Sequence, residues 1–263
     1  ELSSAALELD ATELARMRTQ LEQTLQPVGI GEVRLLVNGR DLNAGLVTLD
    51  AVRTDNGPIV LTATEFGAYL GDEITSIPGV SGEIVPLAAS VRDVDVAADD
   101  SRAAMLLDDG FVYTVSDGGV DQLDSRPGLV APSMDEYGYT WTVPSSDAHA
   151  VLAWRPEVAS LAIADAFPEA STISQLRIGP DGVRAAAVVV VGNQRWVAVA
   201  AIIRDANGVP SSFGPTHLVT QLDGGATVAD MSWVGEETLS LLIASDGARA
   251  VLTQDIGGPG SSA

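Results

Sequence analysis

The chain has 263 residues, and its 36 acidic residues against 14 basic ones, every one an Arg, give a formal net charge of −22. Nucleic acids and anionic membrane surfaces bind through basic patches, so this balance argues against both as partners. Cys is absent, which excludes disulfides, thiolate metal sites and Cys nucleophiles. With 46% hydrophobic residues, the chain can fill the core of one large or two modest domains.

One amphipathic helix is predicted near the start of the chain. Asp10 and Glu13 have the spacing of a capping box at a helix N-terminus. Apolar residues then recur at helical spacing: Leu14, Met17, Leu21 and Leu25. Pro27 ends the helix, and a strand over residues 32–37 with an Asn-Gly turn follows. Residues 1–43 are too few to own a core, so we interpret them as the end of an α/β domain.

Residues 44–256 consist of short apolar runs separated by turn dipeptides. Asn-Gly and Asp-Gly pairs favour tight hairpins with positive φ. Three of these pairs are Asp109-Gly110, Asp181-Gly182 and Asn207-Gly208. The longest apolar stretch, 185–203, has a polar turn at its centre, which predicts two core strands and not a membrane span. We therefore predict an all-β domain over 44–256 and a flexible end over 257–263.

A repeated unit runs through this region, in which a strand, an acidic turn, an Arg and an apolar strand follow one another. Its copies are 94–105 and 176–187, with looser copies at 131–141 and 231–239. Aligning Val96, Ser133, Ile178 and Trp233 gives a mean spacing of about 46 residues, which is the length of a propeller blade. A β-sandwich would not explain a repeat of this period. The fold class predicted is mainly β, a propeller of about five or more blades.

The sequence lacks the motifs of nucleophilic or metal-dependent hydrolysis. No GxSxG or HExxH pattern is present, and the two histidines are His149 and His217. His149 shares one polar loop with Ser145 and Asp147, whereas the members of a triad come from separate elements. We predict that the protein is not an enzyme and has no catalytic residues.

Acidic residues gather near one predicted strand and raise the question of a Ca²⁺ site. Asp93 and Asp95 alternate, so they face the same side of a strand. Further carboxylates follow in turns: Asp99, Asp100, Asp108 and Asp109. The spacing is not that of an EF-hand loop, and turn residues of this kind are usually solvated. No metal and no cofactor site is predicted.

Three residues are candidates for protein contacts. Tyr137 and Tyr139 share one face if their segment is extended. Arg155 lies next to Trp154 and is a candidate interface anchor. Trp141 and Trp233 fall inside the repeated units, so we expect them to pack within the blades.

Several segments together resemble a known family. They are LVAPSMD at 129–135, GYTWTV at 138–143, LRIGPDGVRAA at 176–186, IIRDANG at 202–208 and DMSW at 230–233. In this order they resemble the propeller of the actinobacterial LpqB lipoproteins. The helix and Val-rich strand before them resemble the end of a GerMN domain. Met134 departs from the family pattern, which more often has Trp there, and residues 178–181 depart at a turn.

The resemblance implies a lipid-anchored protein on the outer face of the cytoplasmic membrane. It implies a non-enzymatic accessory role in the MtrA–MtrB two-component system, through contact with the extracytoplasmic domain of the MtrB sensor histidine kinase. Contact with the membrane would occur only through a lipid anchor that is absent from this chain. Since residue 1 is Glu and no signal peptide is present, we expect a piece of a longer protein, lacking also the first part of the GerMN domain and the last part of the propeller.

Two other functions remain open from the sequence. A propeller hydrolase or lactonase would hold a metal in its channel, and it requires Asp and Glu side chains that converge there. A cell-wall glycan-binding module would require an exposed platform of several aromatic residues. We expect the accessory role, because no catalytic constellation is visible.

Overall fold

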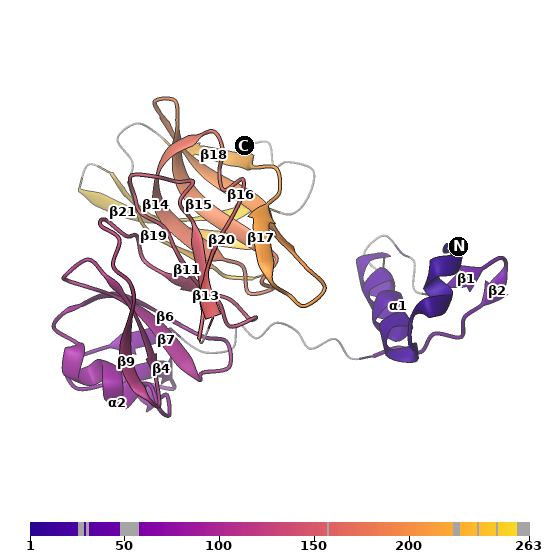
Figure 1. Cartoon of the computed structure of the whole chain (residues 1–263), viewed down its shortest axis with the longest axis horizontal. Coiled ribbons are helices and arrows are strands. Elements are labelled where there is room, and N and C mark those ends of the chain that lie inside the picture. The colour runs from indigo at the N-terminus through magenta and orange to yellow at the C-terminus, as the bar shows by residue number, and fades with distance from the viewer. Residues whose placement is uncertain are drawn as a thin grey trace. The chain divides into compact units, whose positions relative to one another are not determined.

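The computed structural model describes residues 1–25, 29, 32–47, 58–156, 158–222, 227–235, 237–245 and 247–256. The chain divides into two compact units, Glu1–Ala51 and Val52–Ala263 (Figure 1). Pro27 and the expected flexible end at 257–263 lie outside the described residues.

The first unit contains the helix that the sequence predicts. Its elements are η1 (Ser4–Glu8), α1 (Ala11–Leu25), β1 (Leu36–Val37) and β2 (Arg40–Asp41). The capping box is confirmed, because Asp10 Oδ1 accepts the backbone N–H of Glu13 at 2.8 Å and Glu13 Oε2 accepts that of Asp10 at 2.8 Å. The strand expected over 32–37 is shorter, and only its last two residues pair with β2.

The second unit is mainly β and has the arrangement of a five-bladed propeller (Figure 1). Blade 1 comprises β3 (Ile59–Leu61), β4 (Phe66–Leu70) and β5 (Glu73–Ser76), and it is followed by α2 (Ser81–Ile84) and η3 (Val85–Leu87). Blade 2 comprises β6 (Val91–Val96), β7 (Arg102–Leu107), β8 (Val112–Ser116) and β9 (Gly119–Asp124). Blade 3 comprises β10 (Ser133–Met134), β11 (Thr140–Thr142), β12 (Leu152–Arg155) and β13 (Val158–Ala162).

The last two blades differ in size. Blade 4 comprises β14 (Ala170–Ile178), β15 (Arg184–Val191), β16 (Gln194–Arg204), β17 (Pro210–Phe213) and β18 (His217–Leu222), with both β17 and β18 paired to β16. Blade 5 comprises β19 (Thr227–Trp233), β20 (Thr238–Ser245) and β21 (Ala248–Asp255). The innermost strands of neighbouring blades pack on each other, β6 on β10, β10 on β14 and β14 on β19.

The first hairpins of blades 2 to 5 fix how the repeats align. One backbone hydrogen bond closes the base of each hairpin, and its N–H donors are Ala97, Asp135, Gly179 and Val234. The residue before each donor therefore occupies the equivalent position: Val96, Met134, Ile178 and Trp233. The sequence alignment through Ser133 was wrong by one residue, because Met134, and not Ser133, precedes the donor that closes the blade 3 hairpin. The mean spacing does not change, since it depends only on the first and last copies.

The apolar stretch at 185–203 forms the two core strands that the sequence predicts. β15 and β16 pair over eight residues on each strand, and Gly192 turns the chain with a φ of 60°. Within the described residues, no helix is long and apolar enough to cross a membrane. The largest core cluster joins blades 3 and 4, where Trp141 stacks on Phe213 at 5.9 Å and Phe167 meets Phe213 edge-on at 5.3 Å. Burying each of these rings contributes roughly 1.5–3 kcal/mol.

Candidate functional site

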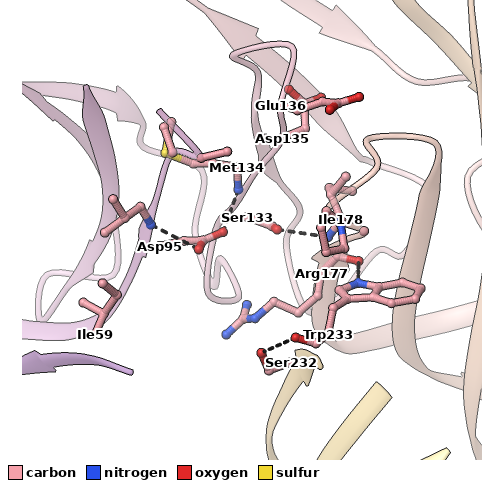
Figure 2. A pocket seen from close by; sticks show the side chains of 15 residues that line it. Ile59, Asp95, Ser133, Met134, Asp135, Glu136, Arg177, Ile178, Ser232 and Trp233 are labelled. Carbon is pink, nitrogen blue, oxygen red and sulfur yellow. Dashed lines mark hydrogen bonds between the residues drawn. The ribbon is translucent and has the colours of Figure 1, made fainter. Parts of the chain in front are cut away.

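A cavity of about 300 Å³ opens where the inner strands of the blades end. The hairpin register brings four equivalent positions to this cavity, one from each of blades 2 to 5: Asp95, Ser133, Arg177 and Ser232. Ile59 of blade 1 lines it too. Figure 2 shows Arg177 reaching into the space between the side that carries Trp233 and the side that carries Asp95 and Ile59.

Arg177 is the main charged group of the cavity, and its guanidinium binds three other blades. Nε donates to Met231 O at 3.0 Å and Nη2 to Asp230 Oδ1 at 3.1 Å, both in blade 5. Nη2 also lies 3.4 Å from Asp93 Oδ1 in blade 2. Nη1 approaches the carbonyl oxygens of Ala131 and Pro132, just before blade 3, at 3.5 and 3.4 Å. The side chain is 12% exposed, so these contacts are held in a largely dry environment.

The carboxylates around Arg177 carry more negative charge than this one Arg balances. Burial, together with the smaller effects of the charges of Asp230 and Asp95, raises the pKa of Asp93 to about 6 against the opposing effect of Arg177. Burial also raises the pKa of Asp95 and that of Glu136. The surroundings of Arg177 are therefore acidic, and burial is the main reason why the pKa values of Asp93 and Asp95 lie above their usual range.

Other polar groups of the cavity tie each inner strand to the next one. Met134 N donates to Asp95 Oδ2 at 2.7 Å, which joins blades 2 and 3. Ile178 N donates to Ser133 Oγ at 3.0 Å, which joins blades 3 and 4. Trp233 Nε1 donates to the carbonyl oxygen of Arg177 at 3.2 Å, which joins blades 4 and 5. These bonds satisfy buried polar groups at the strand ends and fix the blades against each other.

Tyr137 and Tyr139 do not share an exposed face, because residues 136–138 form a turn and not an extended segment. Tyr139 is 3% exposed and belongs to the core between blades 3 and 4. This contradicts the interpretation of the two tyrosines as a surface pair. Tyr137 remains partly exposed, and its ring lies over Arg204 of β16, with the guanidinium carbon 4.2 Å from the ring centroid.

The Tyr137 side chain packs closely against two turns of blade 4. A Cβ added to Gly182 would lie 2.7 Å from the Tyr137 ring, and one added to Gly208 would lie 2.8 Å from it. Both glycines have positive φ, 65° and 77°, which favours Gly in any case. The Tyr137 ring thus fits between two backbone turns. It can approach them so closely only because both carry glycine.

Beneath this ring lies a buried ion pair. Arg204 Nη2 donates to Asp135 Oδ2 at 2.6 Å, with 7% and 0% of the two side chains exposed. Trp141 Nε1 donates to the same carboxylate oxygen at 2.8 Å, and Tyr139 N donates to the other at 2.8 Å. Arg204 also donates to the carbonyl oxygens of Gly182 and Gly208. Every strong group of the pair is satisfied, so this cluster locks blade 3 to blade 4.

Arg155, the third candidate for a protein contact, lies at the end of β12 and is exposed. Its guanidinium carbon lies 5.7 Å from the centroid of the Tyr139 ring. Its position leaves it accessible to a partner.

The histidines and acidic residues singled out in the sequence lie apart from one another. His149 Nδ1 lies 3.1 Å from Ala166 O, and its backbone N–H donates to Asp147 Oδ1 within a turn. His217 lies in β18 of blade 4. Asp93 and Asp95 both lie near Arg177, but only Asp95 lines this cavity. Among the described residues no three metal-ligating side chains gather in one place.

The aromatic residues are mostly packed inside the blades. Trp141 is fully buried, and Trp233 packs under Arg184, whose guanidinium carbon lies 5.8 Å from its ring centroid. Of the tyrosines and tryptophans, all of them described, only Tyr69 and Tyr137 are more than a third exposed, and these two belong to blades 1 and 3.

Sequence reasoning missed Arg177 and Arg204, the two residues that organise these clusters. Each is a lone charge at or near the end of an apolar strand, in LRIG and in AIIRD. A charge at such a position is rarely buried without a partner, and this is the signal that could have found them.

Comparison with known proteins assigns the propeller. Residues 65–262 match the family model described as the lipoprotein LpqB beta-propeller domain. The chain belongs to this family. The match begins at residue 65, so the LpqB assignment rests on the second unit. LpqB is a lipoprotein family, which indicates a location in the cell envelope. No curated protein matches the chain at a significant level.

Several solved structures are similar to this LpqB propeller at low sequence identity. A putative TolB from Agrobacterium tumefaciens is 9% identical with a TM-score of 0.50, over 73% of this chain and 69% of that one. TolB from Acinetobacter baumannii is 14% identical with a TM-score of 0.43, over 82% and 58%. The propeller domain of Cps50 (Swd1) from Myceliophteria thermophila is 12% identical with a TM-score of 0.40, over 64% and 55%. The chain thus spans little more than half the length of two of these three.

Proposed function

We propose that the chain is the propeller module of a non-enzymatic accessory lipoprotein on the outer face of the cytoplasmic membrane of an actinobacterium. Its partner is the extracytoplasmic domain of a sensor histidine kinase of the MtrB type, whose signalling it tunes. In this proposal, Glu1–Ala51 is the end of a GerMN domain. Membership of the LpqB propeller family is the observation that carries the proposal.

The geometry of the cavity supports a binding role over a catalytic one. Three polar side chains that line the cavity are engaged in hydrogen bonds between blades: Asp95, Ser133 and Arg177. A nucleophile would have to give up such a bond in order to react. A propeller held in this way is a rigid body that presents its outer turns to a partner.

One face of the propeller is suited to a basic partner. The first hairpins of blades 2 to 5 end in turns that carry acidic residues, and we name this surface the hairpin face: Asp99, Asp100, Glu136, Asp181 and Glu237. Because these turns lie at the same end of their blades, the carboxylates add to one field. Opposite charges across an interface accelerate association and make it sensitive to salt. The kinase responds only if its signalling states bind this face with different affinities.

The test is binding of the purified chain to the extracytoplasmic domain of the kinase at low and at high salt. The proposal predicts binding that weakens as ionic strength rises. The double variant Glu136→Lys with Glu237→Lys should lose most of the affinity. The matched control, Glu73→Lys with Glu83→Lys, makes the same change of net charge on β5 and α2, outside the first hairpins, and we expect it to bind nearly as the parent does.

Two results would contradict the proposal in different ways. If neither this chain nor the full ectodomain binds the kinase, the partner is wrong. If both double variants weaken binding equally, the hairpin face is not the contact surface, since only the net charge would matter.

A further inference from the structure

The outermost strand of blade 5 has an open edge. β21 pairs with β20, and within the described residues it has no strand on its other side. Seven of its eight residues are exposed, including Val251 at 68% and Leu252 at 40%. Blades 2 and 3 each have one strand more than blade 5. An open edge that carries exposed apolar residues is a template for another strand.

The register of β21 tells which backbone groups point outward. Ile256 N donates to Glu237 O at 2.8 Å, which makes this a hydrogen-bonded pair of the β20–β21 ladder. Bonded and non-bonded pairs alternate in an antiparallel ladder. Gln254, Leu252, Ala250 and Ala248 therefore turn their backbone groups toward β20. The free edge presents the N–H and C=O groups of the odd-numbered residues: Arg249, Val251, Thr253 and Asp255.

The odd-numbered residues of one β21 strand are complementary to those of a second, antiparallel β21 strand. A two-fold axis through Leu252 places Arg249 of one copy opposite Asp255 of the other, and Val251 opposite Thr253. All four belong to the set whose backbone groups point outward, so the hydrogen bonds of the two strands match. Residues directly opposite each other also project their side chains to the same face of the sheet. The two-fold axis therefore produces two opposite-charge pairs.

The charged residues of this edge are available for such pairs. Among the described residues, Arg249 has no ion-pair partner. Asp255 Oδ1 accepts the hydroxyl of Thr238 at 2.8 Å and no cation. The carbonyl oxygen of Asp255 accepts Gln254 Nε2 at 2.8 Å and retains a second lone pair for a ladder bond.

Other registers between the two strands lose either backbone hydrogen bonds or the charge pairs. If the pairing shifts by one residue, the backbone groups that point outward on one strand lie opposite residues whose groups point inward on the other, and the hydrogen bonds cannot form. An axis through Val251 places Arg249 opposite Thr253, and an axis through Thr253 places Asp255 opposite Val251. Only the axis through Leu252 pairs the two charges.

We propose that two copies of this chain associate through β21, antiparallel and with Leu252 on the two-fold axis. The two three-stranded sheets of blade 5 then join into one sheet of six strands. The interface is isologous, so it closes at the dimer and does not continue into fibres. This surface is separate from the hairpin face, and the dimer proposal does not depend on the proposed function.

Sedimentation velocity over a range of concentrations tests the proposal. We expect a reversible dimer of the parent chain. Arg249→Asp and Asp255→Arg each replace two attractive pairs by two repulsive ones, which should weaken the dimer at least about tenfold. The double variant Arg249→Asp with Asp255→Arg restores both pairs in reverse, and its dimer should return to within about threefold of the parent.

A further variant separates edge pairing from folding. Val251→Pro removes an outward N–H that bonds nothing in the monomer, so it should abolish the dimer and leave the thermal unfolding transition nearly unchanged. A parent chain that stays monomeric at all concentrations overturns the proposal. The chain would behave in this way if another strand covered the edge of β21. A dimer that is indifferent to the charge reversals, or a double variant that fails to recover, overturns it as well.

Discussion

Two arginines of blade 4 make opposite use of their carboxylate neighbours. Arg204 meets one carboxylate, Asp135, which two further N–H donors also bind, and aromatic rings close the cluster. Arg177 shares its guanidinium between Asp93 and Asp230 and several carbonyl oxygens, with Asp95 close by. The first cluster is balanced in charge, whereas the second has an excess of negative charge.

The difference shows how burial and charge balance assign roles to ion pairs. A buried pair with every bond satisfied has one low-energy arrangement, so it fixes the blades. A cluster with excess carboxylates stores repulsion, and its energy changes when a proton or a cationic group arrives. The Arg204 cluster is therefore structural, and the Arg177 cluster is the part of the propeller whose stability responds to its surroundings.

Breaking the balanced pair should have the largest effect. Arg204→Ala leaves the Asp135 carboxylate buried without its cation, which should lower the free energy of unfolding by about 3–5 kcal/mol. Urea denaturation measures the loss. Arg155→Ala removes an exposed cation beside the same aromatic cluster and should cost about 0.5 kcal/mol or less. Equal losses in the two variants would show that Arg204 acts as an ordinary surface charge.

The close approach of Tyr137 to blade 4 should be the next largest contribution. Gly208→Ala forces a side chain into positive φ, at about 1–2 kcal/mol, and also pushes a methyl group against the ring. Gly110→Ala is the matched control, since Gly110 has a φ of 83° and nothing lies within 4 Å of its added Cβ. We expect Gly208→Ala to lose about 1–3 kcal/mol more than the control in the same urea experiment. A difference near zero would mean that the ring moves away without cost.

A substitution in the acidic cluster around Arg177 should change the free energy of unfolding by less, and it should stabilise the propeller. Because the folded state raises the pKa of Asp93 to about 6, the folded protein binds this proton more tightly than the unfolded chain does. The resulting stability is present at low pH and is lost as pH rises through about 6. Asp93→Asn should therefore stabilise the propeller at pH above 7 by on the order of 1 kcal/mol.

This gain should disappear once the pH falls below the ordinary pKa of Asp, since Asp93 of the parent is then neutral in both states. Urea unfolding of parent and variant at several pH values measures the difference. A variant that is less stable than the parent at neutral pH would show that the bond of Asp93 to Arg177 outweighs the cost of burying the Asp93 charge near Asp230 and Asp95.

Local patterns explain why much of the fold could be predicted from the sequence. The capping box at Asp10, the hairpin around Gly192 and the repeat of inner hairpins all depend on residues close together in the chain. The repeat alignment failed at Ser133, because the residue at which the strand ends and the turn begins depends on the backbone hydrogen bond of the hairpin, which composition does not reveal.

The candidate sites could not be predicted in the same way, since their contacts join distant segments. Arg204 and Asp135 are 69 residues apart, and Arg177 and Asp93 are 84 apart. Tyr139 was misplaced because its exposure depends on the turn before it and on a blade that comes later in the chain. Which side chains meet across blades is decided by the arrangement of the blades, and no local pattern records it.

The reach of Arg177 has a consequence for how the propeller folds. In most repeat proteins each unit contacts only its neighbours, so part of the array can form or open by itself. Here one guanidinium of blade 4 holds blades 2 and 5 at once, through residues 84 and 53 positions away. This contact forms only when both blades are in place, and the entropy of closing such long loops must be overcome first. Arg177 should therefore make unfolding more nearly all-or-none, with the blades losing their structure together.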